Sequence, residues 1–334
     1  MTVDLQAREI KPLRNTFSHV ARYVGDDKPA TRYQEGTFGA QATANFHYRP
    51  TWAPEYELFD ASRSAVVMAD WYSLKDPRQF YYGTWTMARA RQQDAMEANY
   101  QFVESRNLVA KMPDALRAKV CEVLIPFRHV AWGGNMNNCF IAAYGYGTAL
   151  TAAASLHAMD ELGVAQYITR LALALEEPVV LDEGKKDWLN KADWQPLRHM
   201  VEDLFVLTDP MEVFVAQNLA LDGLIYPLIF GNFVDGHVAL SGGTAVSMLC
   251  AFMVEWHDES NRWVDGVLKA AVAESTANAA LISGWANQWA QRAHRALVPI
   301  AEMAMAHAGD AALGDVVTLL EARAKKIGIT LQVA

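Results

Sequence analysis

The residues best able to do chemistry are a few histidines and carboxylates set in apolar helical sequence. His129 lies within Cys121–Leu150, a segment too long and too apolar for a surface helix. A buried helix with a histidine can be part of a metal site, and a bundle that holds two irons takes a Glu-x-x-His motif from each of two helices. The residue three positions before His129 is Pro126, so this motif lacks its carboxylate.

Four acidic residues are candidate partners for that histidine. Glu122 precedes His129 by seven residues and shares its helix face, and Asp222 lies within an apolar helical stretch. Glu255 begins a Glu-x-x-Asp sequence that ends at Asp258, where a ligand motif would have histidine. A dry two-iron site needs about four carboxylates and two imidazoles, and this set falls short. We therefore interpret the residues as a buried polar network. The alternative is a self-contained metal oxidase that uses Glu122, His129, Asp222 and Glu255.

The elements that must position these groups are helices. Asp76-Pro77 predicts the start of a long helix that runs to about Asn107, because proline favours the first helical position. The next helix starts at Pro113-Asp114 and either kinks or restarts at Pro126. A Gly-Gly pair at 133–134 then allows another helix to approach closely, or breaks this one.

Helical spacing continues to the C-terminus, with a turn predicted over 176–184. No strand, repeat or interdomain linker is evident, so residues 77–334 are predicted to form one all-α domain. The predicted helical segments are Thr151–Asp160, Val164–Leu175, Lys186–Leu207, 209–233, 244–268 (extending at most to Trp289), Ala293–His307 and Ala311–Lys326.

Residues 1–76 differ from the rest, because glycine, proline and aromatic residues alternate in them without a helical period. We predict an extended N-terminal arm, too aromatic to remain disordered in water. The arm either wraps its own helical body or lies partly on a partner, and its aromatic rings provide enough area for one side of a standard interface, roughly 800 Å². The candidate interface residues are Phe46, Tyr48, Trp52, Tyr56, Phe59 and Trp71.

Composition excludes several classes of protein. The 29 basic and 38 acidic residues give a net charge of −9 without a basic block, which disfavours nucleic acid and anionic membrane as partners. No apolar signal core and no uncharged run of membrane-spanning length is evident, so a cytoplasmic location is expected. The three cysteines (Cys121, Cys139 and Cys250) form no CxxC motif and are interpreted as small buried hydrophobic residues.

Several stretches resemble the β subunit of bacterial multicomponent monooxygenase hydroxylases. Arg32–Glu35, Asn45–Pro50 and Asp76–Gly83 are most similar to the phenol hydroxylase branch, whose relatives act on toluene, alkenes and methane. Further similarity lies in the sequences FRHVAWGGNMNN, AQNLALDGL and STANA.

The resemblance implies a ferritin-like helical bundle with extra helices, without metal or cofactor of its own. It implies a hydroxylase built as a dimer of αβγ, in which the α subunit carries the di-iron site. An NADH-dependent reductase and a small regulatory protein complete that system, and O₂ is used to hydroxylate an aromatic ring. The resemblance further implies that vestigial ligand positions are occupied by His129, Asp222, Glu255 and Asp258. The chain would then support the α subunit and would not itself catalyse the reaction. A third possibility is a binding module with a small apolar ligand between its helices.

Overall fold

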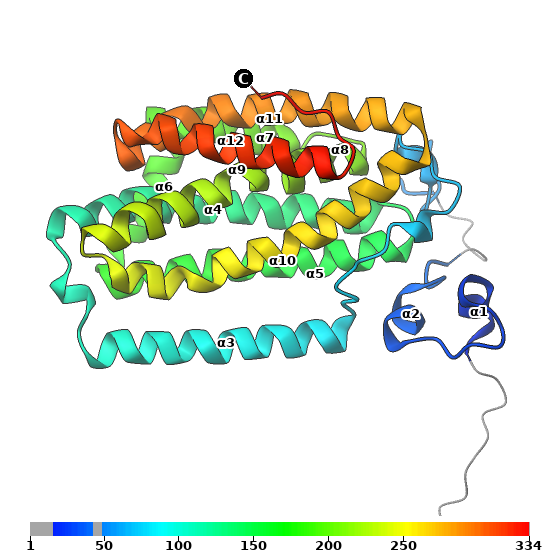
Figure 1. The fold of residues 1–334 in the computed structure, drawn as a ribbon, viewed down its shortest axis with the longest axis horizontal. Coiled ribbons are helices and arrows are strands. Elements are labelled where there is room, and N and C mark those ends of the chain that lie inside the picture. Colours follow the sequence, from blue (N-terminus) through cyan, green and yellow to red (C-terminus); the bar gives the residue numbers. More distant parts are fainter. Residues whose placement is uncertain (1–15, 43–48, 334) are drawn as a thin grey trace, which may run out of the picture.

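The computed structural model describes residues 16–42 and 49–333, and the regular secondary structure in these two ranges is entirely helical. The prediction of an all-α fold is therefore confirmed. Figure 1 shows α3 along one edge of the helical body and α11 and α12 along the opposite edge, with α4, α5 and α10 between them. Two short helices, α1 and α2, lie at one end of the body.

Helices cover most of the chain after residue 81, and two short helices precede it. Their bounds are α1 Ser18–Val24, α2 Arg32–Thr37, α3 Tyr82–Ser105, α4 Asp114–Tyr144, α5 Thr148–Leu175, α6 Val179–Asn190, α7 Gln195–Leu204, α8 Pro210–Phe214, α9 Asp222–Tyr226, α10 Thr244–Glu274, α11 Thr276–Met305 and α12 Ala308–Lys326. Single 3₁₀ turns lie at Ala61–Arg63, Trp71–Ser73, Val109–Lys111, Ala192–Trp194 and Ala239–Ser241.

Helix α4 is continuous through Pro126, so it does not restart there. The glycine pair serves close approach rather than a break. A Cβ at Gly133 would lie 2.5 Å from Val201 Cγ1 of α7, and a Cβ at Gly134 would lie 2.9 Å from the carboxyl carbon of Glu161 on α5. The absence of both side chains lets α5 and α7 pack closely against α4.

The start of α3 differs from the prediction. The Asp76 carboxylate accepts hydrogen bonds from the backbone N–H and the guanidinium of Arg78, so it closes a turn instead of capping a helix. Gln79 has a positive φ of 54°, which a helix cannot contain, and α3 begins only at Tyr82.

Two later predicted boundaries were also wrong. The segment 186–207 is not one helix, because the chain is extended at Lys191 before α7 starts. The predicted turn over 176–184 is shorter, and α6 already begins at Val179. Helix α10 ends at Glu274, and the Ser275 hydroxyl accepts from the backbone N–H of Asn278 to cap α11.

A helical stretch from Pro210 to Ser241 runs through the middle of the core. It includes π-helical turns at Val215–Leu221 and Pro227–Val238 on either side of α9. It is long and apolar enough to cross a membrane by length and composition, although Glu212, Asp222 and Asp235 interrupt it, so it is not an uncharged run of that length. Its most apolar window is 94% buried inside the protein, so those side chains are used for packing.

Candidate functional site

A polar cluster lies in the core where α5 faces α9. Within the described ranges, one group of three side chains brings its potential metal ligands within 4.8 Å of one another: His157, Glu161 and Asp222. His157 and Glu161 lie one turn apart on α5, and Asp222 is the first residue of α9. Each of the three is at most 4% exposed.

Neighbouring side chains hold the two carboxyl groups in place. The Tyr226 hydroxyl donates to Glu161 Oε2 at 2.8 Å, and the Gln217 amide donates to Asp222 Oδ1 at 2.8 Å. Asn137 of α4 in turn donates to the Gln217 carbonyl at 2.8 Å. The second oxygen of each carboxyl group has no hydrogen-bond partner among the described residues.

His157 lies 3.8 Å from that second oxygen of Glu161, measured from Nε2 to Oε1. Its ring stacks on Trp256 with centroids 5.1 Å apart and planes 16° apart, and Trp263 covers it at the same centroid distance. Neither ring nitrogen has a hydrogen-bond partner in the described chain. A second buried histidine, His257, stacks on Tyr226 at 5.3 Å, and its Nε2 likewise lacks a partner.

Burial shifts the titratable groups of this cluster towards their uncharged forms. Burial raises the pKa of Asp222 to about 7, and burial together with the nearby Asp222 raises the pKa of Glu161 well above its usual range. Burial also lowers the pKa of His157 well below its usual range and that of His257 to about 3. At pH 7 Glu161 therefore retains its proton, Asp222 is about half protonated and the two histidines are neutral, which reduces the cost of burying the cluster.

The donor set does not match a two-iron site. Such a site takes about four carboxylates and two histidines from facing helices. Around Glu161 the structure provides two carboxyl groups, each with one oxygen already engaged, and two histidines. Helix α4 faces Glu161 with Gly134, which has no side chain to contribute. The residues of this cluster therefore do not fit a two-iron centre.

Of the predicted site residues, Asp222 alone lies in this cluster. Glu122 forms ion pairs with Lys119 and Lys191 at the other end of α4. His129 is half-buried and stacks on Trp188 with ring centroids 5.7 Å apart, and burial lowers its pKa to about 4.

Glu255 and Asp258 are exposed on α10, whereas Trp256 and His257 between them are buried. The four residues of the alternative metal site, Glu122, His129, Asp222 and Glu255, are thus not brought together.

Sequence reasoning missed His157, Glu161 and His257. The signal was present for the first two, because a His-x-x-x-Glu spacing places both side chains on one helix face. The predicted break between Asp160 and Val164 separated Glu161 from that helix, whereas α5 is continuous. For His257, the Glu-x-x-Asp pattern directed attention to the two exposed residues beside it.

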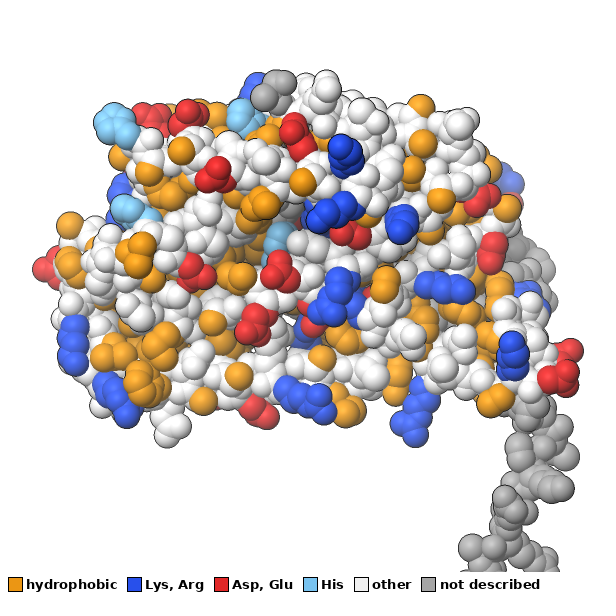
Figure 2. All heavy atoms as spheres, in the orientation of Figure 1, with side chains coloured by type: hydrophobic (Ala, Val, Ile, Leu, Met, Phe, Trp, Pro, Cys, Tyr) orange, Lys and Arg blue, Asp and Glu red, His pale blue; other side chains and the backbone are white. Residues whose placement is uncertain are grey.

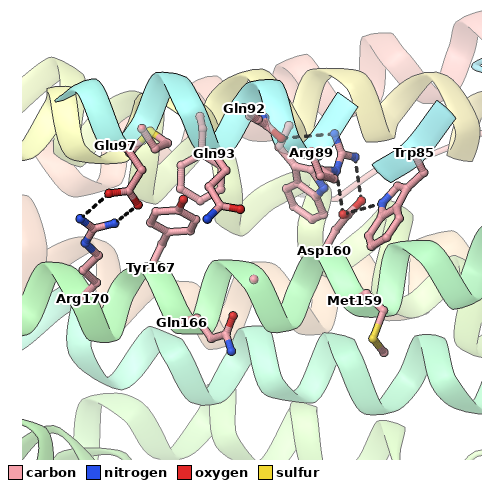
Figure 3. Close-up of a pocket in the computed structure, with 14 residues that line it drawn as sticks. Trp85, Arg89, Gln92, Gln93, Glu97, Met159, Asp160, Gln166, Tyr167 and Arg170 are labelled. Atoms are coloured by element: carbon pink, nitrogen blue, oxygen red, sulfur yellow. Dashed lines mark hydrogen bonds and ion pairs between the residues drawn. The ribbon is translucent and has the colours of Figure 1, made fainter. Parts of the chain in front are cut away.

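A cleft of about 380 Å³ lies between α3, α5 and α10, beside the buried cluster. Figure 3 shows an ion pair at each end of this cleft. At one end Arg89 of α3 pairs with Asp160 of α5 at 2.7 Å, and at the other Arg170 of α5 pairs with Glu97 of α3.

The indole of Trp256 lines this cleft and stacks on His157, so it separates the cleft from the cluster. Glutamines and these charged pairs alternate with apolar side chains along the walls. The lining is therefore mixed, in contrast to the apolar cavity expected of a module that binds a small apolar ligand.

The arm is fixed to the C-terminal end of α4. The Trp52 indole donates to the Tyr144 hydroxyl at 2.9 Å, and the Arg63 guanidinium lies over the rings of Tyr56 at 4.4 Å and Tyr144 at 4.9 Å. Trp52 nevertheless remains 71% exposed. This part of the arm thus contacts its own body and still presents an aromatic surface.

The other candidate interface residues are placed differently. Phe59 is 37% exposed, whereas Trp71 is only 8% exposed and packs edge-to-face on Tyr146 with centroids 5.7 Å apart. Little of the Trp71 ring is therefore left to contact another protein. Phe46 and Tyr48 lie outside the described residues.

Comparisons with known proteins agree with this helical architecture. Residues 52–275 match the methane/phenol/alkene hydroxylase family, and the chain belongs to that family. It is 43% identical to the phenol 2-monooxygenase oxygenase component DmpL of Pseudomonas sp. strain CF600, over 98% of each chain. It is also similar to the crystal structure of phenol hydroxylase from Pseudomonas sp. OX1, with a TM-score of 0.92 and 39% identity over 98% of this chain and 99% of that one.

A more distant relative is the hydroxylase component subunit beta of the toluene-4-monooxygenase system from Ectopseudomonas mendocina. It is 21% identical over 73% of this chain and 74% of its own length. The chain is thus a member of the oxygenase-component family of phenol monooxygenases, as the sequence resemblance implied.

Proposed function

We propose that this chain is the non-catalytic β-type subunit of the hydroxylase component of a phenol or aromatic monooxygenase. Its role is to support a companion α subunit whose di-iron site activates O₂ and hydroxylates an aromatic ring. The full-length relatives are oxygenase components of phenol 2-monooxygenases, and the toluene-4-monooxygenase relative is named as a β subunit. A β subunit implies at least one different subunit in the same component.

The observation that carries this proposal is the composition of the buried cluster. Tyr226 and Gln217 occupy one oxygen each of Glu161 and Asp222. Glu161 and Asp222 are the two carboxyl groups that the cluster offers, about half the number that a two-iron site takes. A donor set this small supports a structural role for the cluster, with the metal chemistry on another polypeptide.

The remaining parts of the proposed system follow from the sequence resemblance. The hydroxylase would be a dimer of αβγ in the cytoplasm, to which an NADH-dependent reductase supplies electrons and a small regulatory protein binds. Nucleic acid and membrane have no part in this proposal. The net charge of −9 supports that exclusion.

Metal analysis of the purified chain tests the proposal. The chain produced alone in iron-supplemented cells should contain far less than one metal ion per chain and should show no O₂-dependent hydroxylation of phenol. Co-expression with an α subunit should give a stable complex with iron. About one iron or more per isolated chain would overturn the proposal.

The alternative metal oxidase makes the opposite predictions for the same samples. It requires turnover by the isolated chain, together with loss of metal in His129→Ala. His129 lies against Trp188 and away from the buried cluster, so we expect this variant to leave metal content unchanged.

A further inference from the structure

The outer faces of α4 and α5 form a surface without charged side chains. Helix α4 exposes residues at positions i, i+4, i+7 and i+11, and α5 runs beside it with a matching exposed row. We call this surface the α4–α5 face. It consists of Trp132, Met136, Cys139, Ala143, Ser155, Met159 and Leu162.

The lack of charge extends over 40 residues, from Val130 to Thr169. Charged residues make up 20% of the whole chain, yet this stretch contains two, Asp160 and Glu161, and both are buried. By contrast, acidic and basic side chains are scattered over the face of the molecule that Figure 2 shows. The α4–α5 face therefore lacks the charged side chains that are found on the face shown in Figure 2.

Aromatic side chains extend this face at both ends. Trp132 packs edge-to-face on Phe205, just after α7, with ring centroids 5.8 Å apart. At the other end Trp52 of the arm is bonded to Tyr144, the last residue of α4. Ion pairs follow outside these ends, between Arg198 and Glu202 beside Phe205 and between Arg49 and Glu57 beside Trp52.

An uncharged centre rich in aromatic and methionine side chains, with a charged rim, is the composition of a protein–protein interface. The large apolar side chains are substantially exposed, with Trp132 at 47%, Met136 at 43%, Met159 at 43% and Leu162 at 37%. Together with Trp52 they present several hundred Å², on the order of the apolar part of a standard interface of about 800 Å² per partner. Surfaces that bind membranes instead combine apolar side chains with lysine and arginine, which this face lacks.

We propose that the α4–α5 face is the surface on which a companion, non-identical subunit of the oxygenase component docks, through an uncharged apolar helical face of its own. This inference rests on the proposed function, because the β-subunit name of the toluene-4-monooxygenase relative implies such a partner. A second copy of this chain is the competing occupant, and the experiments separate the two.

A charge placed at the centre of the face tests the proposal. Met136→Glu preserves helix propensity and leaves the fold of the chain intact, since Met136 is exposed. The matched control is Leu319→Glu, at a residue 64% exposed on α12. Each variant is co-expressed with the companion subunits of its own oxygenase component, and the Kd of the complex and the Tm of the isolated chain are measured.

Met136→Glu should weaken the complex at least a hundredfold with the Tm of the isolated chain unchanged, whereas Leu319→Glu should assemble like the unmodified protein. Equal assembly of both variants would overturn the assignment of this face. If sedimentation shows that the isolated chain is a dimer, and Met136→Glu makes it monomeric without affecting the complex, the occupant is a second copy and the proposal fails. Should the unmodified chain bind no companion subunit, the proposed function itself fails.

Cys139 provides a second measurement that needs no substitution. Its thiol is exposed at the centre of the face, so the interpretation of all three cysteines as buried was wrong for Cys139, whereas Cys121 and Cys250 are buried. N-ethylmaleimide should label Cys139 of the isolated chain rapidly and label it at least a hundredfold more slowly in the purified complex, with the two buried thiols slow in both. Equal labelling of Cys139 in the two samples would overturn the proposal even if Met136→Glu failed to fold.

Discussion

The carboxyl group of Glu161 lies directly against Gly134. A Cβ built on Gly134 would lie 2.9 Å from the carboxyl carbon and 3.1 Å from each carboxyl oxygen. Helix α4 therefore meets α5 at a position where it has no side chain, and this close contact keeps Glu161 99% buried. The geometry of the polar cluster depends on that contact.

Gly134→Ala should destabilise the protein, because the added methyl group must displace Glu161 from a fully packed site. We expect a loss of about 1–3 kcal/mol in the free energy of unfolding, as for other overpacked core positions. Urea unfolding of the purified chain, followed by circular dichroism, measures it.

Gly163→Ala is the control for this substitution. Gly163 is a helical glycine too, in α5, but a Cβ there would meet no atom within 4 Å. Alanine should therefore stabilise that helix by about 0.5–1 kcal/mol. Equal effects of the two substitutions would show that α4 and α5 can separate at no cost.

The general architecture could be predicted from the sequence because helical periodicity is a local property. Pro126 and Gly134 were recognised as special positions, and their effect on α4 could not be decided without the neighbouring helices. Membership of the cluster is a different kind of property, since it depends on which helices face each other. Asp222 stood out as an acid in an apolar stretch, but its partner Glu161 is 61 residues away, and no spacing in the sequence connects them.

Asp222→Asn should make the protein relatively more stable as pH rises. The folded-state pKa of Asp222 is about 7, against 3.8 for the unfolded chain. Between those values the folded state binds the extra proton, so this group contributes stability at low pH that is lost as pH rises towards and through 7. Asparagine keeps the acceptor for Gln217 and cannot ionise, so the variant escapes this loss.

The quantity to measure is the difference in free energy of unfolding between the variant and the unmodified chain, from pH 5 to pH 8. It should shift in favour of the variant by about 2–4 kcal/mol. The stability of the unmodified chain as a function of pH does not isolate Asp222. His257 and His129 have lowered pKa values of about 3 and 4, so they make the folded state more stable as pH rises and oppose the effect of Asp222. A pH-independent difference would contradict the prediction, and Asp94→Asn, on the exposed surface of α3, is the matched control.

Arg89→Met should loosen the attachment of α3. Arg89 pairs with Asp160 of α5 at 2.7 Å and with Glu259 of α10 at 2.8 Å, so it joins three helices beside the cleft. Its removal leaves two partly buried carboxylates without this cation, at a cost of about 2–4 kcal/mol. Limited proteolysis should then cut the connection between α3 and α4 faster, while Arg91→Met on the exposed side of α3 should not change the rate.

Trp52→Ala and Trp71→Ala should have opposite effects on assembly and on stability. Trp71 is 8% exposed within the core, so its truncation should cost about 3–5 kcal/mol and lower the Tm of the isolated chain.

Trp52 is 71% exposed and makes one hydrogen bond to Tyr144, so its truncation should change the Tm of the isolated chain by no more than a few degrees. If the arm lies on a companion subunit, Trp52→Ala should instead weaken the complex about tenfold or more, because exposed tryptophans are frequent anchors of interfaces. Calorimetry of the isolated chain and titration of the complex measure the two effects. A fall in Tm for Trp52→Ala as large as that for Trp71→Ala, with unchanged assembly, would mean that the arm serves only its own helical body.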